Sequence, residues 1–447
     1  MRTARPEQTG TSVRSAEVVI IGAGVIGASV AYHLAHKGCE SVLVLERNRE
    51  PGGGSTSRAT GGFRAQFGSE INIRLSLLSR EKLLRFEEDL GVHPGYLPYG
   101  YLFLASDGEQ LDALRAAQDV QRAAGLKEAR EVTPSEIEEI NPAIRTDGLV
   151  GGIFCPTDGF IRPMEILRGY VEGAARLGVR FEYGVEGADY ELDRSGRIST
   201  VRTSGGDVAA GEVVNAAGAW AAPVAREAGL DLPVEPLRRQ AAVTYPFDLL
   251  PEEMPMTIFA EDGFHLRVRD GRVLILWPDE PDVADHFDQS VDDAWLGTVF
   301  EMARSRVPCL RHASIDRERC WAGLYTRWTH THSDHPGSQK TNQTSHRNFY
   351  ETHYLEPRTL VEKQWERHVV HRAEGSQQPT FAAPVAATPA EDVARRITRH
   401  KMPAKTPPSS CLASTTRIQR LRSRFLCSSA GTTSLIGPQV GRVETDE

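Results

Sequence analysis

Three glycines near the start of the chain have the spacing that lets a backbone approach a phosphate. Gly22, Gly24 and Gly27 form a G-x-G-x-x-G pattern between an apolar strand-like run and a helical pattern. In this motif the first glycine allows a tight turn, the second admits a pyrophosphate, and the third lets helix and strand pack closely. The first helical amides, at Val25 and Ile26, would then face the phosphates.

An acidic residue follows at the end of the next strand-like run. Glu46 comes after the apolar stretch 41–45 and is followed by Arg47. A carboxylate at this point of such a motif accepts hydrogen bonds from a ribose 2′-OH. Strand, helix and acid together favour a dinucleotide site over a glycine-rich turn without a ligand.

A second glycine-rich segment favours a flavin over a nicotinamide. The loop 52–62 is rich in hydroxyls and glycines, which can surround a pyrophosphate and a ribityl chain with donors. A flexible linker is the alternative interpretation of this loop. A later segment, 213–220, is a short strand that ends in small residues before a helix, which also suits close approach by a cofactor.

At these residues the chain resembles the flavin-dependent amine and amino-acid oxidoreductases of the D-amino-acid oxidase superfamily, in particular the branch of sarcosine oxidase beta-subunit, dimethylglycine dehydrogenase and glycine oxidase. The resemblance covers about 16–325. It also rests on the segment 62–67, the turn at 157–159 and the segment 321–325.

The resemblance implies FAD as the cofactor and a set of residues that hold it. By resemblance, Gly22, Gly24, Gly27 and Glu46 hold the ADP half, Ser55, Thr56 and Ser57 the phosphates and ribityl chain, and the backbone of Val185 the adenine, while Ala217 and Gly218 line the cofactor cleft. Further expected cofactor contacts are Val25, Ile26, Arg47, Gly61, Gly62 and Trp220. The cysteine that tethers FAD in some relatives corresponds to Gly323, so the resemblance implies non-covalent FAD.

The reaction that the resemblance implies is oxidation of a small secondary or primary amine or amino acid, of the sarcosine, dimethylglycine, glycine or D-amino-acid type. A hydride leaves the carbon beside a neutral nitrogen for flavin N5, and water hydrolyses the imine. A bidentate guanidinium is the natural partner of the substrate carboxylate. Arg64, His265 and Arg267 are the catalytic candidates.

Each candidate also has a purely structural interpretation. Arg64 could be a loop residue in a surface ion pair. His265 and Arg267 are two apart on an expected strand and share one face, which could be the solvent face. Trp321 and Tyr325, four apart in a turn-like segment, are more typical of a core than of a substrate wall.

Alternating strand and helix patterns predict an α/β protein, α+β overall, in which a Rossmann-like FAD-binding domain adjoins an antiparallel substrate sheet. Long helices are expected at 70–90 and 163–177. The expected divisions are a flexible extension at 1–15, the FAD domain at 16–90 with 150–235, the substrate domain at 91–149 with 236–325, and an atypical, poorly ordered tail at 326–447.

Composition limits the classes of partner and the cellular location that we expect. The net charge of −8 argues against nucleic acid, and no apolar run is long enough to span a membrane. Six scattered cysteines suggest neither disulfides nor a metal site, which fits the cytoplasm. We therefore expect a small-molecule amine or amino-acid substrate, oxygen or an electron carrier as acceptor, and a hetero-oligomer with other oxidase subunits.

The last part of the chain has a different amino-acid composition from the rest. Residues 326–447 carry 17 basic and 11 acidic residues and 8 of the 14 histidines. The family's Glu-Met-Thr-Pro-Asp and Gly-Phe-Ser-Gly-His segments do not occur there. Codons ACG-AGA-TGG for 326–328 would give Glu-Met if read from the third base, and 429–434 would give a flavin-loop sequence at the same offset. We hypothesise that most of 326–434 is an out-of-frame reading, the alternative being a divergent natural tail.

We predict that the coding DNA for 326–434 contains a displaced frame. Restoring the frame after Tyr325 is expected to produce a Glu-Met-Thr-Pro-Asp sequence, and the original frame is expected to return near Gly437. Sequencing the coding DNA checks this directly. A single intact frame with ordinary synonymous codon bias throughout would contradict the hypothesis.

Overall fold

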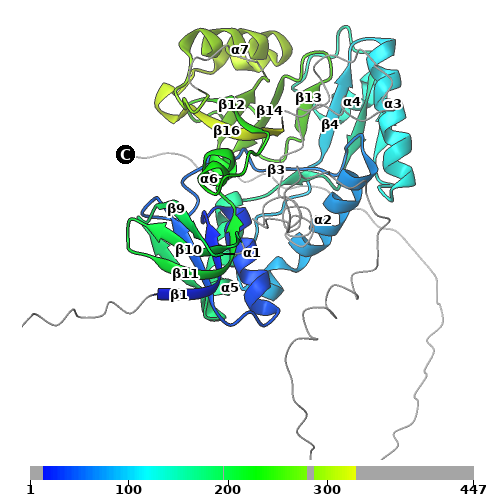
Figure 1. Cartoon of the computed structure of the whole chain (residues 1–447). Coiled ribbons are helices and arrows are strands. Elements are labelled where there is room, and N and C mark those ends of the chain that lie inside the picture. The colour runs from blue at the N-terminus through cyan, green and yellow to red at the C-terminus, as the bar shows by residue number, and fades with distance from the viewer. Residues whose placement is uncertain (1–13, 195, 279–285, 329–447) are drawn as a thin grey trace, which may run out of the picture. The chain divides into compact units, whose positions relative to one another are not determined.

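Short apolar strands and intervening helices build two larger sheets in this protein. The computed structural model describes residues 14–194, 196–278 and 286–328, and all structural statements concern these residues. Figure 1 shows the two sheets with the helices that cover them.

The first sheet has six strands, in the order β8 (Arg180–Tyr183), β2 (Val42–Glu46), β1 (Arg14–Ile21), β11 (Val208–Asn215), β10 (Ile198–Thr203) and β9 (Gly187–Leu192). The first four strands are parallel, and β10 and β9 continue the sheet antiparallel. β2 is buried along its whole length, as expected for a parallel strand with both faces covered.

Alternate residues of β1 pack on opposite faces of this sheet. Val18 and Ile20 face a cluster with residues of α1 (Val25–His36) and α5 (Pro163–Arg176), whereas Val19 and Ile21 belong to the cluster on the other face. That second face is covered in part by α6 (Ala221–Glu227). The glycine motif therefore lies at the carboxyl end of a rigid, doubly covered strand.

The second sheet has eight strands, in the order β16 (Trp321–Trp328), β12 (Val234–Val243), β15 (Arg272–Leu276), β14 (His265–Arg269), β13 (Met256–Phe259), β4 (Tyr101–Ala105), β6 (Gly151–Cys155) and β5 (Arg130–Val132). Its main core contains Leu102, Phe264, Leu266 and Ile275, and Val299 from α7 (Asp293–Arg306) packs onto them. The helices α3 (Gly108–Ala123) and α4 (Pro134–Ile140) also contact this sheet.

A two-stranded sheet and a long helix complete the region around the expected flavin loop. β3 (Gly62–Phe63) pairs with β7 (Gly159–Phe160), and α2 (Glu70–Leu90) follows β3 and ends at Gly91, whose φ of 75° suits glycine. The remaining elements are the short helices η1 (Gly218–Trp220), η2 (Pro308–His312) and η3 (Arg317–Arg319).

The predicted fold class is confirmed, and so are the predicted helices at 70–90 and 163–177, the second within one residue. The sheet expected to be antiparallel contains one parallel pair, β13 with β4. Strand direction depends on connections between distant segments, here the insertion that carries β4, and strand patterns do not report it.

Three boundaries also need correction. Gly151–Cys155, assigned to the cofactor domain, forms β6 of the eight-stranded sheet. Arg14 and Ser15, assigned to the extension, begin β1. Trp321–Tyr325 is a strand and not a turn, and β16 pairs with β12 as far as Trp328. A Cβ at Gly323 would lie 3.2 Å from Arg58, so the glycine suits close packing of the strand. The rest of the tail, 329–447, lies outside the described residues.

Candidate functional site

The glycine motif brings three backbone segments into direct contact. Gly22 has φ of 106°, and a Cβ on it would lie 2.6 Å from the Ala216 carbonyl oxygen. A Cβ on Gly27 would lie 1.9 Å from the Gly22 carbonyl oxygen. A Cβ on Gly24 would meet the Thr56 hydroxyl oxygen at 3.4 Å, an ordinary contact. Packing within the protein therefore requires glycine at positions 22 and 27. At position 24 the protein has room for a Cβ, so we attribute that glycine to close approach by a ligand.

Glu46 is buried beside this turn and held by three donors. Its Oε2 accepts a hydrogen bond from the Ala23 N–H at 2.8 Å, and its Oε1 accepts bonds from the Asn48 N–H at 2.9 Å and the Asn48 side-chain amide at 2.7 Å. The carboxylate is thus fixed at the start of α1, where the resemblance places the ribose of the ADP half.

The hydroxyls of the second glycine-rich loop have partners within the protein. The Thr56 Oγ1 accepts a hydrogen bond from the Val25 N–H at 3.2 Å, at the first turn of α1. Ser55 donates to the Leu324 carbonyl at 2.5 Å, and Ser57 donates to the Gly54 carbonyl at 3.2 Å. These residues therefore shape the loop around the helix N-terminus, and their expected contact with phosphates stays a prediction.

Arg47 and Trp220 stack on each other near the loop. The Arg47 Cζ lies 3.9 Å from the centroid of the Trp220 ring, and that ring stacks on Phe287 with centroids 5.7 Å apart. Ala217 directly precedes the short helix η1, which runs from Gly218 to Trp220. The Val185 N–H donates to the Glu46 carbonyl at 2.9 Å, so a backbone contact from Val185 to adenine would use its carbonyl.

The residues present fit a dinucleotide. The first turn of α1 offers amides at Ile26 and Gly27 that a helix cannot satisfy internally. Gly24 leaves room for close backbone approach, and the Glu46 carboxylate is fixed beside it. This donor and acceptor set matches the pyrophosphate and ribose of FAD.

His265 lies on β14, half-buried and with a defined tautomer. Its Nδ1 donates to the Gly263 carbonyl at 2.8 Å, so in the neutral ring Nε2 carries no proton. Burial lowers the pKa of His265 to about 4, and the nearby positive charge of Arg64 lowers it further. The ring is therefore neutral at pH 7.

Arg64 is partly buried and lies against two phenylalanine rings. Its Cζ lies 4.4 Å from the Phe67 ring centroid and 5.6 Å from that of Phe103. The charge also acts on the hydroxyl groups of Tyr101 and Tyr325. Arg64 and His265, far apart in sequence, thus belong to one cluster.

Arg267 is buried and bound to the loop before β3. Its side chain is 4% exposed, its Nη1 donates to the carbonyls of Thr60 at 3.1 Å and Gly61 at 3.2 Å, and its Nε donates to the Val268 carbonyl at 3.1 Å. The face shared by His265 and Arg267 is therefore not the solvent face. These bonds connect Arg267 to the loop before β3, and its expected contact with a substrate carboxylate stays a prediction.

The sequence analysis did not single out Asp158 or Tyr101 as site residues, and it treated Tyr325 as more typical of a core. Asp158 is fully buried, accepts bonds from the Ala65 N–H at 2.8 Å and the Gln66 side-chain amide at 3.1 Å, and has its pKa raised to about 6 by burial. Tyr101 and Tyr325 have their pKa raised for the same reason. The turn at 157–159 was the one available signal for Asp158.

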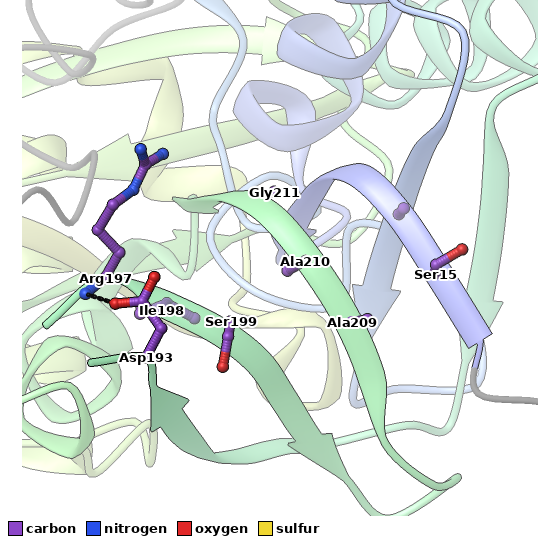
Figure 2. Close-up of a pocket in the computed structure, with 9 residues that line it drawn as sticks. Ser15, Asp193, Arg197, Ile198, Ser199, Ala209, Ala210 and Gly211 are labelled. Atoms are coloured by element: carbon purple, nitrogen blue, oxygen red, sulfur yellow. Dashed lines mark hydrogen bonds between the residues drawn. The ribbon is translucent and has the colours of Figure 1, made fainter. Parts of the chain in front are cut away.

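Figure 2 shows a different pocket, which lies away from this site. It is lined by Ser15 and Ala16 at the start of β1, and by residues of β10 and β11. The glycine motif follows the opposite, carboxyl end of β1, where open α/β sheets bind their ligands. The pocket is therefore not the expected cofactor site.

The described part of the chain has neither a membrane-spanning helix nor a cluster of metal ligands. In residues 14–194, 196–278 and 286–328, no helix is both long and apolar enough to cross a bilayer. The same ranges contain no group of three or more His, Cys, Asp or Glu side chains placed to hold a metal ion.

Fold and site together define a dinucleotide-binding protein with a second sheet adjoining the nucleotide loop. A model of the family described as "FAD dependent oxidoreductase" matches residues 17–351. The chain belongs to this family, whose members are FAD-dependent oxidoreductases. The match ends at residue 351, so most of the predicted atypical tail lies outside it.

Individual relatives agree with this assignment. Rat mitochondrial dimethylglycine dehydrogenase is 34% identical over 57% of this chain and 30% of its own length. Glycine oxidase of Geobacillus kaustophilus is 30% identical over 69% of this chain and 80% of its own length. The crystal structure of L-proline dehydrogenase from P. horikoshii has a TM-score of 0.65 at 29% identity and covers 70% of this chain and 82% of that one. The chain spans about a third of the length of the mammalian relatives.

The glycines of the motif allow a test that separates folding from binding. Gly24→Ala is expected to cost less than about 1 kcal/mol of stability because its Cβ has room, yet to weaken FAD binding about 100-fold by blocking the pyrophosphate. Gly27→Ala is expected to cost about 3 kcal/mol or more because its Cβ would overlap a carbonyl. Urea unfolding and flavin fluorescence titration measure the two effects. Equal losses of stability in both variants would contradict this division.

His265 is expected to make stability depend on pH. Its pKa is about 4 in the folded protein and 6.5 in the unfolded chain, so the unfolded state takes up the proton first and stability falls as the pH drops from 6.5 to 4. In His265→Asn this fall should be smaller by at most about 1 kcal/mol per pH unit. Urea unfolding at several pH values measures it, with His286→Asn, at an exposed position, as the control. Identical pH profiles for wild type and His265→Asn would refute the assignment.

Proposed function

We propose that this chain uses FAD to oxidise the C–N bond of a small secondary or primary amine that carries a carboxylate, of the sarcosine, dimethylglycine, glycine or D-amino-acid type. The observation that carries the proposal is the cluster of a guanidinium, Arg64 just after β3, and a neutral imidazole, His265 on β14. The names of the relatives, which include a glycine oxidase and dehydrogenases of dimethylglycine and L-proline, support this substrate class.

Arg64 is the proposed partner of the substrate carboxylate. A guanidinium presents N–H groups in a plane that matches the two carboxylate oxygens. The rings of Phe67 and Phe103 lie against the Arg64 guanidinium and limit its movement through cation–π contacts. A fixed cation in partly apolar surroundings binds a carboxylate more strongly than one in water does.

His265 is the proposed acceptor for the amine. The Nδ1 bond to Gly263 leaves Nε2 as the basic nitrogen, and the low pKa keeps the ring uncharged at neutral pH. A neutral imidazole accepts a hydrogen bond from the amine and adds no positive charge that would oppose loss of the ammonium proton. When bound, FAD would be the acceptor of the two electrons and the hydrogen that leave the carbon beside the nitrogen.

Non-covalent attachment of FAD is part of the proposal. Gly323, at the tether position of some relatives, has no side chain that could form a bond. Burial raises the pKa of the nearby Cys320 thiol, which makes that sulfur a poor nucleophile. Cytoplasmic location, the electron acceptor and a hetero-oligomer with other oxidase subunits stay predictions.

The second candidate is a family member without activity, and one observation favours it. The family's flavin-loop sequence does not occur after Tyr325. That loop is expected to supply donors to the flavin ring, so a chain without it would bind FAD weakly.

The visible spectrum of the purified full-length protein tests both candidates. After addition of FAD and removal of excess, absorption bands typical of oxidised flavin that bleach with sarcosine, dimethylglycine, glycine or a D-amino acid under anaerobic conditions would support the enzyme. Retained flavin that none of these substrates bleaches, or no retained flavin, would support the inactive alternative.

Arg64→Met is expected to raise the KM for the amino-acid substrate about 100-fold, because a charge-assisted hydrogen bond to the carboxylate is lost. Oxidation of an analogous amine without a carboxylate should change little. Steady-state kinetics with both substrates measures the difference. Arg304→Met is the matched control, since Arg304 also lies over a phenylalanine ring, that of Phe300, but on α7. An equal loss with both substrates would contradict the assigned role.

A further inference from the structure

Four consecutive carbonyl groups before β3 accept hydrogen bonds from side chains of the eight-stranded sheet. Trp321 donates through Nε1 to the Arg58 carbonyl at 2.8 Å, and Arg269 through Nη1 to the next one, that of Ala59, at 3.4 Å. Arg267 donates to the third and fourth carbonyls, as described above. Residues 58–61 are here termed the clamped segment, and Arg267, Arg269 and Trp321 the clamp.

Arg267 is the centre of the clamp and is costly to bury. In the described part of the chain no carboxylate forms an ion pair with it. Its Cζ lies 3.4 Å from the centroid of the buried Phe160 ring, and burial lowers its pKa to about 9, so it remains charged at pH 7. A buried cation is tolerated when carbonyl oxygens and an aromatic face replace water. The protein therefore uses a charged residue where an apolar one would pack more easily.

The bonds to the carbonyls also set the direction of the amides. In a trans peptide the N–H of the next residue points away from the carbonyl. With the carbonyls of the clamped segment turned toward the clamp, the N–H groups of Thr60, Gly61 and Gly62 turn to the opposite side. Gly61 is held further by the Ile161 N–H, which donates to the Gly61 carbonyl at 2.8 Å.

We propose that Arg267 is a positioning residue, which holds the clamped segment so that the amides of Thr60, Gly61 and Gly62 form a row of donors for the bound cofactor. The inference rests on the proposed function for the identity of the ligand. It assigns to the substrate sheet a part in shaping the cofactor site, through Arg267 and, more weakly, through Arg269 and Trp321.

Limited trypsin digestion of the full-length protein without added FAD tests the clamp independently of activity. Arg58 lies in the clamped segment, so cleavage after it reports local opening. Arg267→Met is expected to raise the rate at which the new end at Ala59 forms about tenfold, measured by mass spectrometry. Arg267→Lys should restore much of the protection, since an ammonium also donates to two carbonyls. The affinity for FAD, measured by flavin fluorescence, should fall about tenfold in Arg267→Met.

Arg272→Met is the matched control. Arg272 lies on the neighbouring strand β15 and donates to the Thr244 carbonyl at 2.9 Å and to Asp316 at 2.8 Å, without contact to the loop. If Arg267→Met does not fold, Trp321→Phe removes the bond to Arg58 and retains the ring.

Unchanged cleavage after Arg58 in Arg267→Met, or equal acceleration in Arg272→Met, would overturn the clamp. Unchanged FAD affinity despite faster cleavage would overturn the link to the cofactor. If the wild-type protein binds no FAD, the proposed function fails, and the digestion still decides whether the clamp exists.

Discussion

The close contact of three backbone segments at Gly22 is the constraint on which the cofactor site depends. The Gly22 carbonyl lies against Gly27 of α1, and the Gly22 Cα lies against the Ala216 carbonyl after β11, at distances that leave no room for side chains. This contact fixes the start of α1 over the ends of β1 and β11. The first helical amides and the Glu46 carboxylate then have fixed positions, because Glu46 is bound to the Ala23 N–H in the same turn.

The two larger sheets meet through the loop between Glu46 and β3. On one side the Thr56 hydroxyl accepts a bond from the first turn of α1, and on the other the carbonyls of 58–61 accept bonds from β14 and β16. The loop is therefore hydrogen-bonded to elements of both sheets. The cluster of Arg64 and His265 lies next to this connection, which puts the proposed substrate groups beside the proposed cofactor groups.

Burial decides the charge states within that cluster. Desolvation keeps His265 neutral, raises the pKa of Asp158 and lowers that of Arg267, but Arg267 stays charged. The charges of Arg64 and Arg267 both act on Tyr101, which lies against the Gly62 Cα. The cluster thus combines cations with a neutral base in one partly apolar place, as binding of an anionic amine substrate requires.

The sequence by itself determined the nucleotide half of this protein. The glycine spacing, the acid at the end of β2 and the apolar pattern of β1 are local signals, and each reports a requirement at its own position. The tertiary structure alone decided the hydrogen-bond partners of Arg267, the burial of Asp158 and the direction of β4 beside β13. These features depend on segments about 100 to 200 residues apart, such as Thr60 with Arg267 and Ala65 with Asp158, and on the burial of each group. A pattern of residue types carries no information on which distant carbonyl a guanidinium will meet.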